Sequence, residues 1–454
     1  MKKLRLKVFI LTLTVLCFLI SALGVSTFAE EYHNTAIIES PDQQSETHFG
    51  FSIDVSEKTL IIGEPLADIG EYSRAGKVYI YDLNGNLKNT LQAPMPKTGG
   101  RFGYSLAIKD EIILIGEPGA DVDVYDQAGQ VYIYNTEGVL QTTIQSPTPD
   151  TWSAFGRSLG FNGDTIIVGE PDADSAGAQF NSGEVHTYNS EGNFLETILP
   201  PEPVGDGNFG HSLDIYDGTF IVGEPFAYVD EISAGKAHVF DSDGNFMATL
   251  QSPAPEYQLS FGHSVAISGD IVAVSEPYTW TDNQTPNAGK VYVFDTEGNF
   301  LVAIQSPNPD GDALFGNSLD MSGDLIIVSE FGADGDRTDE GRAHIFDTEG
   351  KLVTSFKSPL PGTWTSYGNI VKIKEGLIVV QELGSSRVGK VYVYQSGTSP
   401  TPSPSPSPSP SPSPEPTPEP TPKPQGGIPG FPMESLVLGI VIVSVLIWMM
   451  RRSH

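Results

Sequence analysis

The sequence predicts an all-β fold, a seven-bladed β-propeller whose blades are four-stranded antiparallel sheets. A Phe-Gly or Tyr-Gly dipeptide recurs at spacings of 52 to 54 residues, and a period near 50 with short strands is typical of a propeller rather than a helical solenoid. Strands such as 166–168 and 326–328 are apolar at successive positions, which indicates sheets covered on both faces, as in blades packed between neighbours. The repeats begin at Phe49, Phe102, Phe155, Phe209, Phe261, Phe315 and Tyr367.

The fifth repeat displays its four strands most clearly. Strand one is expected at 261–267 and strand two at 271–275, joined by a Ser-Gly-Asp turn. A longer loop ends at Gly289, and strand three follows at 290–295. A Thr-Glu-Gly-Asn sequence, typical of a hairpin turn, leads into strand four at 300–305.

The seventh repeat stops after its third strand, at 390–395. The missing strand is found at the other end of the chain, where Thr35-Ala-Ile-Ile-Glu-Ser-Pro matches the fourth-strand sequence Thr143-Ile-Gln-Ser-Pro. We therefore expect the N-terminal segment to complete blade seven, which would close the ring and leave no open edge between the first and last blades.

Residues 1–29 have the features of a signal peptide: four basic residues, an apolar run and small residues before Ala29. A retained N-terminal anchor is the alternative. The only cysteine, Cys17, lies in this segment, so the mature chain would have no disulfide and no cysteine metal site. Loss of the four positive charges takes the formal net charge from −32 to −36, which argues against nucleic acid and anionic lipid as partners.

The C-terminal end predicts a surface anchor. Residues 30–396 would form the propeller and 397–428 a Ser/Thr/Pro-rich extended stalk. The almost purely Ser-Pro, Thr-Pro and Glu-Pro part of the stalk, 399–424, would span roughly 80 Å at about 3.1 Å per residue. Residues 429–454 hold a short apolar stretch followed by two arginines, so they read as a transmembrane anchor with its C-terminus inside or as a sorting signal; a GPI signal fits less well. Each interpretation gives a secreted protein held at the cell surface, with its membrane partner reached through a helix or a lipid.

The repeat resembles the FG-GAP repeat of integrin α-subunit propellers and their prokaryotic relatives. Phe-Gly-x-Ser is followed by Gly-Glu-Pro and then by Gly-x-Val-Tyr-x-Phe/Tyr over residues 35–395. The resemblance implies a binding face made by the 4–1 and 2–3 loops and a role in adhesion or ligand binding. Likewise, Pro429-Gly430-Phe431 resembles the start of archaeal C-terminal sorting signals.

One feature of that family is missing. Its calcium sites lie in an oxygen-rich loop between strands one and two, where this chain has bare turns such as Ser268-Gly269-Asp270. These turns offer too few oxygens for the six to eight that calcium prefers. We therefore expect no metal and no cofactor.

A glutamate stands at the end of strand two in every repeat, where the family usually has alanine. Two interpretations remain: each carboxylate caps backbone amides locally, which we favour, or the set forms an acidic ring that needs cations or raised pKa values. The seven residues are Glu64, Glu117, Glu170, Glu224, Glu276, Glu330 and Glu382.

The loops predicted to share one face carry aspartates and aromatic residues. Exposed aromatic side chains among carboxylates would suit a glycan, a peptide or a protein partner; alternatively they fill grooves between blades. Asn283 is a candidate glycosylation site in one of these loops. The candidate ligand-binding residues are Asp68, Asp121, Asp174, Asp334, Trp152, Trp280, Trp364, Tyr228 and Tyr257.

No catalytic residue is predicted. Ser158 lies in a Gly-x-Ser-x-Gly sequence, but the same serine recurs in other repeats and no helix follows it, as a nucleophile elbow requires. Three histidines share a strand-three position that is otherwise tyrosine, which indicates packing with a polar tip; His211 and His263 share a strand-one position where either packing or ligand contact is open. The three strand-three histidines are His186, His238 and His344.

We expect an adhesion or recognition module; the alternatives are an extracellular polysaccharide hydrolase or lyase, and a passive cell-envelope component.

Overall fold

The computed structural model describes residues 32–397, apart from 43, 45, 175–179, 258, 282–284, 335–337 and 361–364. The predicted signal peptide, stalk and C-terminal anchor lie outside these residues. So do Asn283, Trp364 and the Pro429-Gly430-Phe431 motif. Within the described part of the chain, no helix is long and apolar enough to span a membrane.

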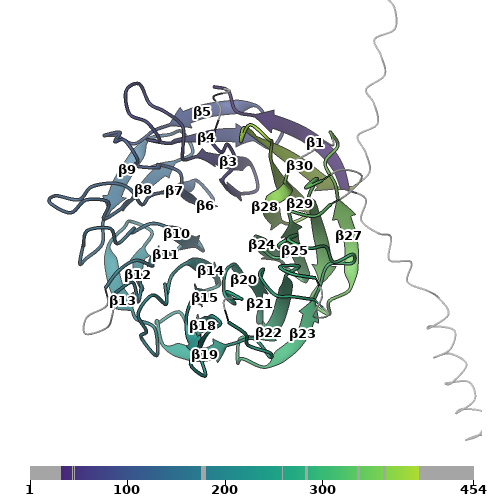
Figure 1. Cartoon of the computed structure of the whole chain (residues 1–454). Helices are drawn as coiled ribbons and strands as arrows, with labels where there is room; N and C mark the ends of the chain where they lie inside the picture. The colour runs from purple at the N-terminus through teal and green to yellow at the C-terminus, as the bar shows by residue number, and fades with distance from the viewer. Residues whose placement is uncertain are drawn as a thin grey trace, which may run out of the picture. The chain divides into compact units, whose positions relative to one another are not determined.

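The structure confirms the predicted all-β propeller: seven four-stranded antiparallel sheets stand around a central axis (Figure 1). Blade one holds β2 (Ser52–Val55), β3 (Thr59–Glu64), β4 (Lys77–Asp82) and β5 (Leu87–Leu91). Blade two holds β6 (Ser105–Lys109), β7 (Ile112–Glu117), β8 (Gln130–Asn135) and β9 (Leu140–Ile144). Blade three holds β10 (Ser158–Phe161), β11 (Thr165–Glu170), β12 (Glu184–Asn189) and β13 (Phe194–Ile198).

The remaining blades follow the same order, with an extra two-stranded hairpin in blade four. Blade four holds β14 (Ser212–Tyr216), β15 (Thr219–Glu224), β18 (Lys236–Phe240) and β19 (Phe246–Leu250), and its loop holds β16 (Tyr228–Val229) and β17 (Ile232–Ser233). Blade five holds β20 (Val265–Ser268), β21 (Ile271–Glu276), β22 (Lys290–Asp295) and β23 (Phe300–Ile304). Blade six holds β24 (Leu319–Ser322), β25 (Leu325–Glu330), β26 (Arg342–Asp347) and β27 (Leu352–Phe356), and blade seven holds β28 (Tyr367–Lys374), β29 (Leu377–Leu383), β30 (Gly389–Ser396) and β1 (Tyr32–Glu39).

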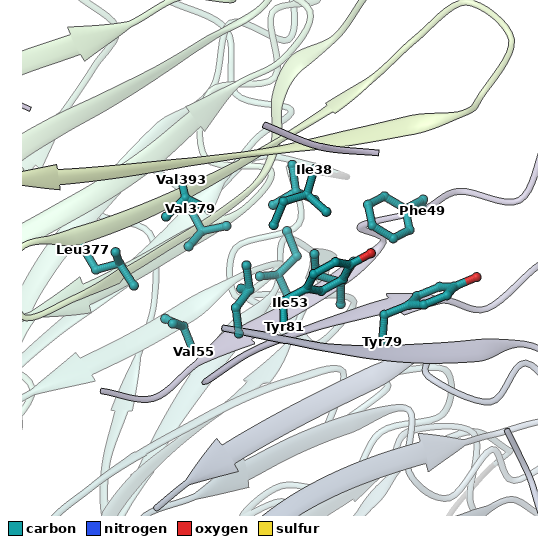
Figure 2. Close-up of a cluster of buried hydrophobic side chains, with 12 residues drawn as sticks. Ile38, Phe49, Ile53, Val55, Tyr79, Tyr81, Leu377, Val379 and Val393 are labelled. Carbon is teal, nitrogen blue, oxygen red and sulfur yellow. The ribbon is translucent and has the colours of Figure 1, made fainter. Parts of the chain in front are cut away.

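The predicted closure is confirmed, because β1 pairs antiparallel with β30 as the outer strand of blade seven (Figure 1). Ile38 lies opposite Val391 in this pair. The side chain of Ile38 also joins a cluster with Phe49 and Tyr79 of blade one and Val379 of blade seven (Figure 2). The N-terminal strand thus contributes both ladder hydrogen bonds and apolar packing to the seam.

Seven buried apolar clusters fill the seven interfaces between adjacent blades. The aromatic ring of each Phe-Gly or Tyr-Gly dipeptide is fully buried and packs on the strand-three tyrosine or histidine of its own blade, as Phe49 does on Tyr79 with ring centroids 5.5 Å apart. Both faces of every blade are therefore covered, which explains why strands two and three are apolar at successive positions.

The serine of the Phe-Gly-x-Ser sequence links neighbouring blades. Ser52 Oγ donates a hydrogen bond to the carbonyl oxygen of Gly103, 2.6 Å away in the next blade. The blades approach closely here: a Cβ on Gly63 would lie 2.3 Å from that same oxygen, and Gly103 itself has a φ of +83°. Both positions therefore favour glycine.

The meander order sets two different faces. Because successive antiparallel strands run in opposite directions, the loops after strands two and four share one face and the turns after strands one and three share the other. Backbone hydrogen bonds join the first set, as from Gly99 N to Ser73 O at 2.8 Å and from Trp152 N to Asp126 O at 2.9 Å. We call this side the loop face and the opposite side the turn face.

Candidate functional site

The loop face presents four of the predicted aromatic residues to solvent. Trp152 is 61 % exposed and Trp280 50 %, so these side chains do not fill grooves between blades. Large apolar side chains from other loops of this face are exposed as well. The exposed set comprises Trp152, Trp280, Tyr228 and Tyr257 from the prediction, together with Tyr72, Met95, Val124, Phe180 and Phe226.

The four predicted aspartates stabilise their own loops. Each accepts a hydrogen bond through Oδ1 from a backbone amide five to seven residues later, an arrangement that holds an irregular loop in one conformation. The donors are Arg74 N to Asp68 (2.9 Å), Gln127 N to Asp121 (3.0 Å), Asn181 N to Asp174 (3.0 Å) and Asp339 N to Asp334 (2.9 Å). All four side chains are exposed, so they give the loop face a negative charge.

The recurrent glutamates are buried, and their hydrogen bonds correct the prediction. We expected them to cap backbone amides, but in the described residues each accepts hydrogen bonds from side chains. The register explains this: Ile62 lies opposite Tyr79, and Glu64 lies opposite Lys77, so Glu64 and Tyr79 share one face of the blade as diagonal neighbours. The strand-three donors to the glutamate Oε atoms are Tyr79 (2.6 Å), Tyr132 (2.6 Å), Tyr292 (2.8 Å), Tyr392 (3.1 Å), His186 (2.7 Å), His238 (2.9 Å) and His344 (2.8 Å).

Oε1 is buried without a hydrogen-bond partner in the glutamates of blades two to six. Blade one differs, because Thr47 Oγ1 donates to Glu64 Oε1 at 2.6 Å. Burial of the carboxylate raises the pKa of Glu117 to about 7, against the opposing effects of the Tyr132 hydroxyl and the Lys97 ammonium. The Glu117 carboxylate is thus a source of pH-dependent stability.

A group of charges near the axis was not predicted. Lys372 Nζ lies 3.6 Å from Asp320 Oδ1. Burial alone would lower the pKa of Lys372, but the carboxylates of Asp320, Asp54 and Asp214 outweigh that effect and raise it. Burial and the nearby Asp320 raise the pKa of Asp214 to about 7.

These aspartates also connect the innermost strands of neighbouring blades. Asp54 Oδ2 accepts from Ile108 N at 2.7 Å and Asp214 Oδ2 from Ile267 N at 2.8 Å. When the strand-one sequences are aligned, these charged residues fall at one position. The other three blades have alanine or glycine at that position: Ala107, Gly160 and Ala266.

A second unpredicted arrangement lies at the loop-face end of the innermost strands, just before strand one. Tyr104 and Arg157 occupy the strand-one position that also holds His211 and His263. The Arg157 guanidinium lies over the Tyr104 ring, 5.6 Å from its centroid, a cation–π geometry. The His211 and His263 rings follow at 5.5 Å from each other, and burial together with the neighbouring histidine and arginine lowers the pKa of His211 to about 3.

A small pocket of about 100 Å³ opens beside Arg157. Besides Arg157 and Tyr104, its wall includes Trp152, Arg101 and Asp172. Two guanidinium groups against one carboxylate make this a positive spot on a chain that has 57 acidic and 25 basic residues. One feature of the sequence could have indicated this pocket: at the strand-one position shared by Tyr104, His211 and His263, only blade three has an arginine.

Larger hollows lie elsewhere but lack aromatic walls. Two on the turn face, of about 570 and 350 Å³, are lined by the charged turns around Glu57 and Lys374. A third, of about 510 Å³, lies on the loop face in blade seven, between Glu382 and Leu360. Size alone would favour these three hollows, but a specific site combines an apolar platform with a few directed polar groups. Of the four pockets described, the one beside Trp152 has both.

The serine-nucleophile interpretation finds no support in the geometry. Ser158 Oγ donates to the carbonyl oxygen of Gly210 in the next blade, at 2.6 Å, so it serves the same structural link as Ser52. The histidines of strand three are buried packing residues with a polar tip, as predicted. Their contacts with the buried glutamates were not predicted.

Comparison with known proteins agrees with the repeat. A family model described as FG-GAP repeat matches residues 32–81, 258–294 and 304–346. These segments cover β1 of blade seven and parts of blades one, five and six, and the other blades share their motif and topology. No curated protein matches the chain.

Proposed function

We propose that the chain is a cell-surface recognition module whose loop face binds an extracellular glycan or protein. The observation that carries this proposal is the exposed Trp152 ring beside the pocket that contains Arg101 and Arg157. An exposed indole offers a flat apolar platform, and large exposed aromatics on a soluble protein mark contact surfaces.

The pocket favours a ligand that bears a carboxylate or another small anion. Arginine presents a planar fork of donors that matches a carboxylate in bidentate geometry. A volume of about 100 Å³ accommodates one functional group rather than a whole sugar ring or side chain. Asp172 accepts a hydrogen bond from Asn208 at 2.9 Å, and burial raises the pKa of its carboxyl group. The Asp172 side chain lies in the pocket wall, where it can accept a hydrogen bond from a ligand hydroxyl.

The rest of the loop face would restrict which ligands reach the pocket. Asp68, Asp121, Asp174 and Asp334 give other loops of the same face negative charge, so a polyanion of uniform charge would be repelled. A chain with isolated carboxylates among neutral groups fits this distribution. The predicted signal peptide, stalk and anchor would hold the propeller outside the cell, where such ligands are found.

The purified protein should be tested against acidic glycans, their carboxyl-reduced forms, neutral glycans and peptides from envelope proteins. Saturable binding without turnover supports recognition. Release of shortened or unsaturated products would instead support a polysaccharide hydrolase or lyase. Absence of binding to every member of the panel would favour a passive envelope component.

A further inference from the structure

Blade three breaks a charge pattern that the other blades keep. Glu184 begins β12, directly opposite Glu170 at the end of β11. At this strand-three position the other six blades carry a basic residue or glutamine: Lys77, Gln130, Lys236, Lys290, Arg342 and Lys390. Blade three therefore places a second carboxylate where a cation or a neutral amide normally stands.

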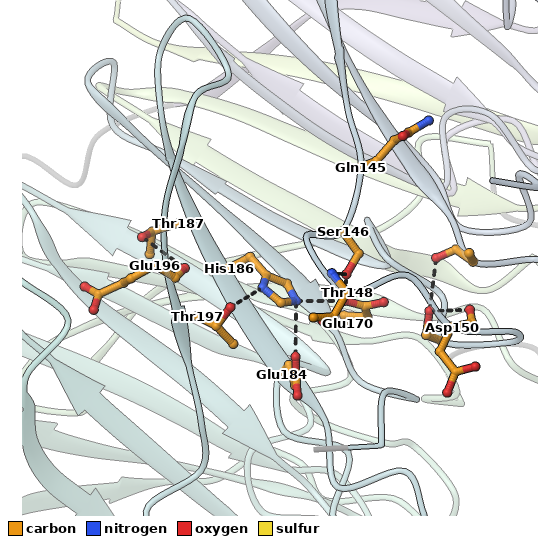
Figure 3. A network of polar contacts seen from close by, with 12 residues as sticks. Gln145, Ser146, Thr148, Asp150, Glu170, Glu184, His186, Thr187, Glu196 and Thr197 are labelled. Carbon is orange, nitrogen blue, oxygen red and sulfur yellow. Dashed lines mark hydrogen bonds and ion pairs between the residues drawn. The ribbon is translucent and has the colours of Figure 1, made fainter. Parts of the chain in front are cut away.

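The second carboxylate lies beside a histidine. His186 Nε2 is 2.7 Å from Glu170 Oε2 and 3.6 Å from Glu184 Oε2 (Figure 3). One ligand atom from each of these three residues lies within 4.8 Å of the others, and no other trio of His, Cys, Asp or Glu among the described residues comes so close together. The side chains are 0 % (His186), 1 % (Glu170) and 10 % (Glu184) exposed.

One carboxylate oxygen of the trio has no partner. Glu170 Oε1 is buried without a hydrogen bond, whereas Oε2 accepts from both His186 and Ser146. A buried carboxylate with an unsatisfied oxygen is costly unless a positive group compensates it. Burial and the nearby Glu170 also raise the pKa of Glu184, against the opposing effect of His186.

Blades four and six provide internal comparisons. Each has the same histidine–glutamate pair, with His238 Nε2 2.9 Å from Glu224 and His344 Nε2 2.8 Å from Glu330. In blade six the Arg342 guanidinium lies 3.7 Å from Glu330, and in blade four a lysine holds the same position. The unpartnered Oε1 is common to all three blades, so the distinguishing feature of blade three is the acidic residue in place of the cation.

We propose that Glu170, Glu184 and His186 form a binding site for a divalent transition-metal ion, with zinc the best match. One imidazole nitrogen and two carboxylate oxygens are a donor set that zinc accepts, with a water molecule in the fourth position. Two carboxylates and a neutral imidazole balance the charge of the ion. Calcium and magnesium fit poorly, because they require more oxygen ligands.

The surroundings suit such a site. Thr197 Oγ1 lies 3.0 Å from His186 Nδ1, so when Nε2 binds the metal, Nδ1 can donate its hydrogen to this hydroxyl and fix the ring. Zinc bonds of about 2.0–2.2 Å separate tetrahedral ligand atoms by about 3.4 Å. The Glu184 contact already has nearly this length, and the Glu170 contact must lengthen by less than 1 Å.

The test is zinc binding by the chelator-treated protein, measured by calorimetry and by thermal unfolding with and without ZnCl2. We expect one zinc ion per chain and a higher unfolding temperature. Glu184→Lys, which gives blade three the residue of blade four, should weaken binding by more than about tenfold and abolish the thermal shift. Glu184→Gln, which uses the residue of blade two, should do the same and guards against misfolding of the lysine variant.

The reverse exchange gives a gain-of-function control. Lys236→Glu converts the blade-four position to that of blade three, and the variant should bind two zinc ions per chain instead of one. Wild-type protein that binds no zinc, or Glu184→Lys and Glu184→Gln variants that bind it as tightly as the wild type, would overturn the proposal.

Discussion

Ile38 and Val391 lie opposite each other across the β1–β30 pair, although almost the whole propeller separates them in the chain. This pair closes the ring, so the first and last strands of the propeller must meet before the fold is complete. Closure by such a long-range pair slows folding and leaves no open edge at the seam between the first and last blades.

The first prediction concerns that seam. Ile38 is 4 % exposed and its neighbour Ile37 is 45 % exposed. Ile38→Ala should lower the free energy of unfolding by about 2–4 kcal/mol, because it leaves a cavity between blades one and seven, whereas Ile37→Ala should cost less than about 1 kcal/mol. Chemical denaturation followed by circular dichroism measures both. Removal of residues 30–41 should cost most of the stability, and unchanged melting of that truncation would exclude the closure model.

The second prediction separates structure from catalysis at Ser158. Ser158→Ala removes the hydrogen bond to Gly210 O and leaves that carbonyl with one partner fewer, so the protein should lose about 1–2 kcal/mol of stability. Ligand binding should stay unchanged. Loss of an activity without loss of stability would contradict the structural role.

The third prediction concerns Glu117. Its pKa of about 7 lies above the ordinary 4.5, so between these values the folded state holds a proton that the unfolded state has released. Stability therefore falls as the pH rises through this window and levels off above it. Glu117→Gln keeps an acceptor for Tyr132 but cannot ionise.

Between pH 5 and pH 8 the wild type should therefore lose about 3 kcal/mol relative to Glu117→Gln. Unfolding free energies at the two pH values give the comparison. Glu137→Gln, which changes an exposed carboxylate, is the control and should follow the wild type. Parallel pH profiles of the wild type and Glu117→Gln would refute the prediction.

The fourth prediction concerns the charges near the axis. Lys372→Met leaves Asp54, Asp214 and Asp320 without their ammonium group, which should destabilise the protein by about 3 kcal/mol at pH 7. Burial already raises the pKa values of Asp54 and Asp214, and Lys372 opposes that effect. Without the lysine, the pKa values of these two carboxylates rise further in the folded state, so they take up protons as the pH falls. The variant should therefore regain stability relative to the wild type from pH 7 to pH 5. Lys374→Met, at the turn-face end of the same strand, should show no such recovery.

The sequence predicted the fold well because the fold is a repeated local pattern. The Phe-Gly-x-Ser motif specifies the close approach of two blades and the hydrogen bond between them, and the strand at 35–41 matched the gap in repeat seven. The partners of the glutamates were missed because the strand-two glutamate and the strand-three tyrosine or histidine were considered separately. The strand register brings them together, and it becomes visible only when both strands are placed.

The pocket and the blade-three trio were missed for a related reason. Each depends on one residue that differs from its equivalents in the other repeats: Arg157 in strand one and Glu184 in strand three. The consequence of such a difference can be deduced only when the positions of the surrounding residues are known. Trp152 was predicted as a candidate from its loop, but its neighbours Arg101 and Tyr104 come from the start of the preceding blade and were not connected with it.

We infer that the ligand binds the loop face at Trp152 and Arg157. The most direct test compares binding of the best ligand from the glycan and peptide panel to the wild type and to Trp152→Ala, Arg157→Gln and Tyr216→Ala. Tyr216 is an exposed aromatic residue next to a strand-one turn on the turn face, so it is the matched control. We predict that the first two variants lose at least tenfold in affinity, while Tyr216→Ala binds as the wild type does; unchanged affinity in Trp152→Ala and Arg157→Gln would contradict the claim.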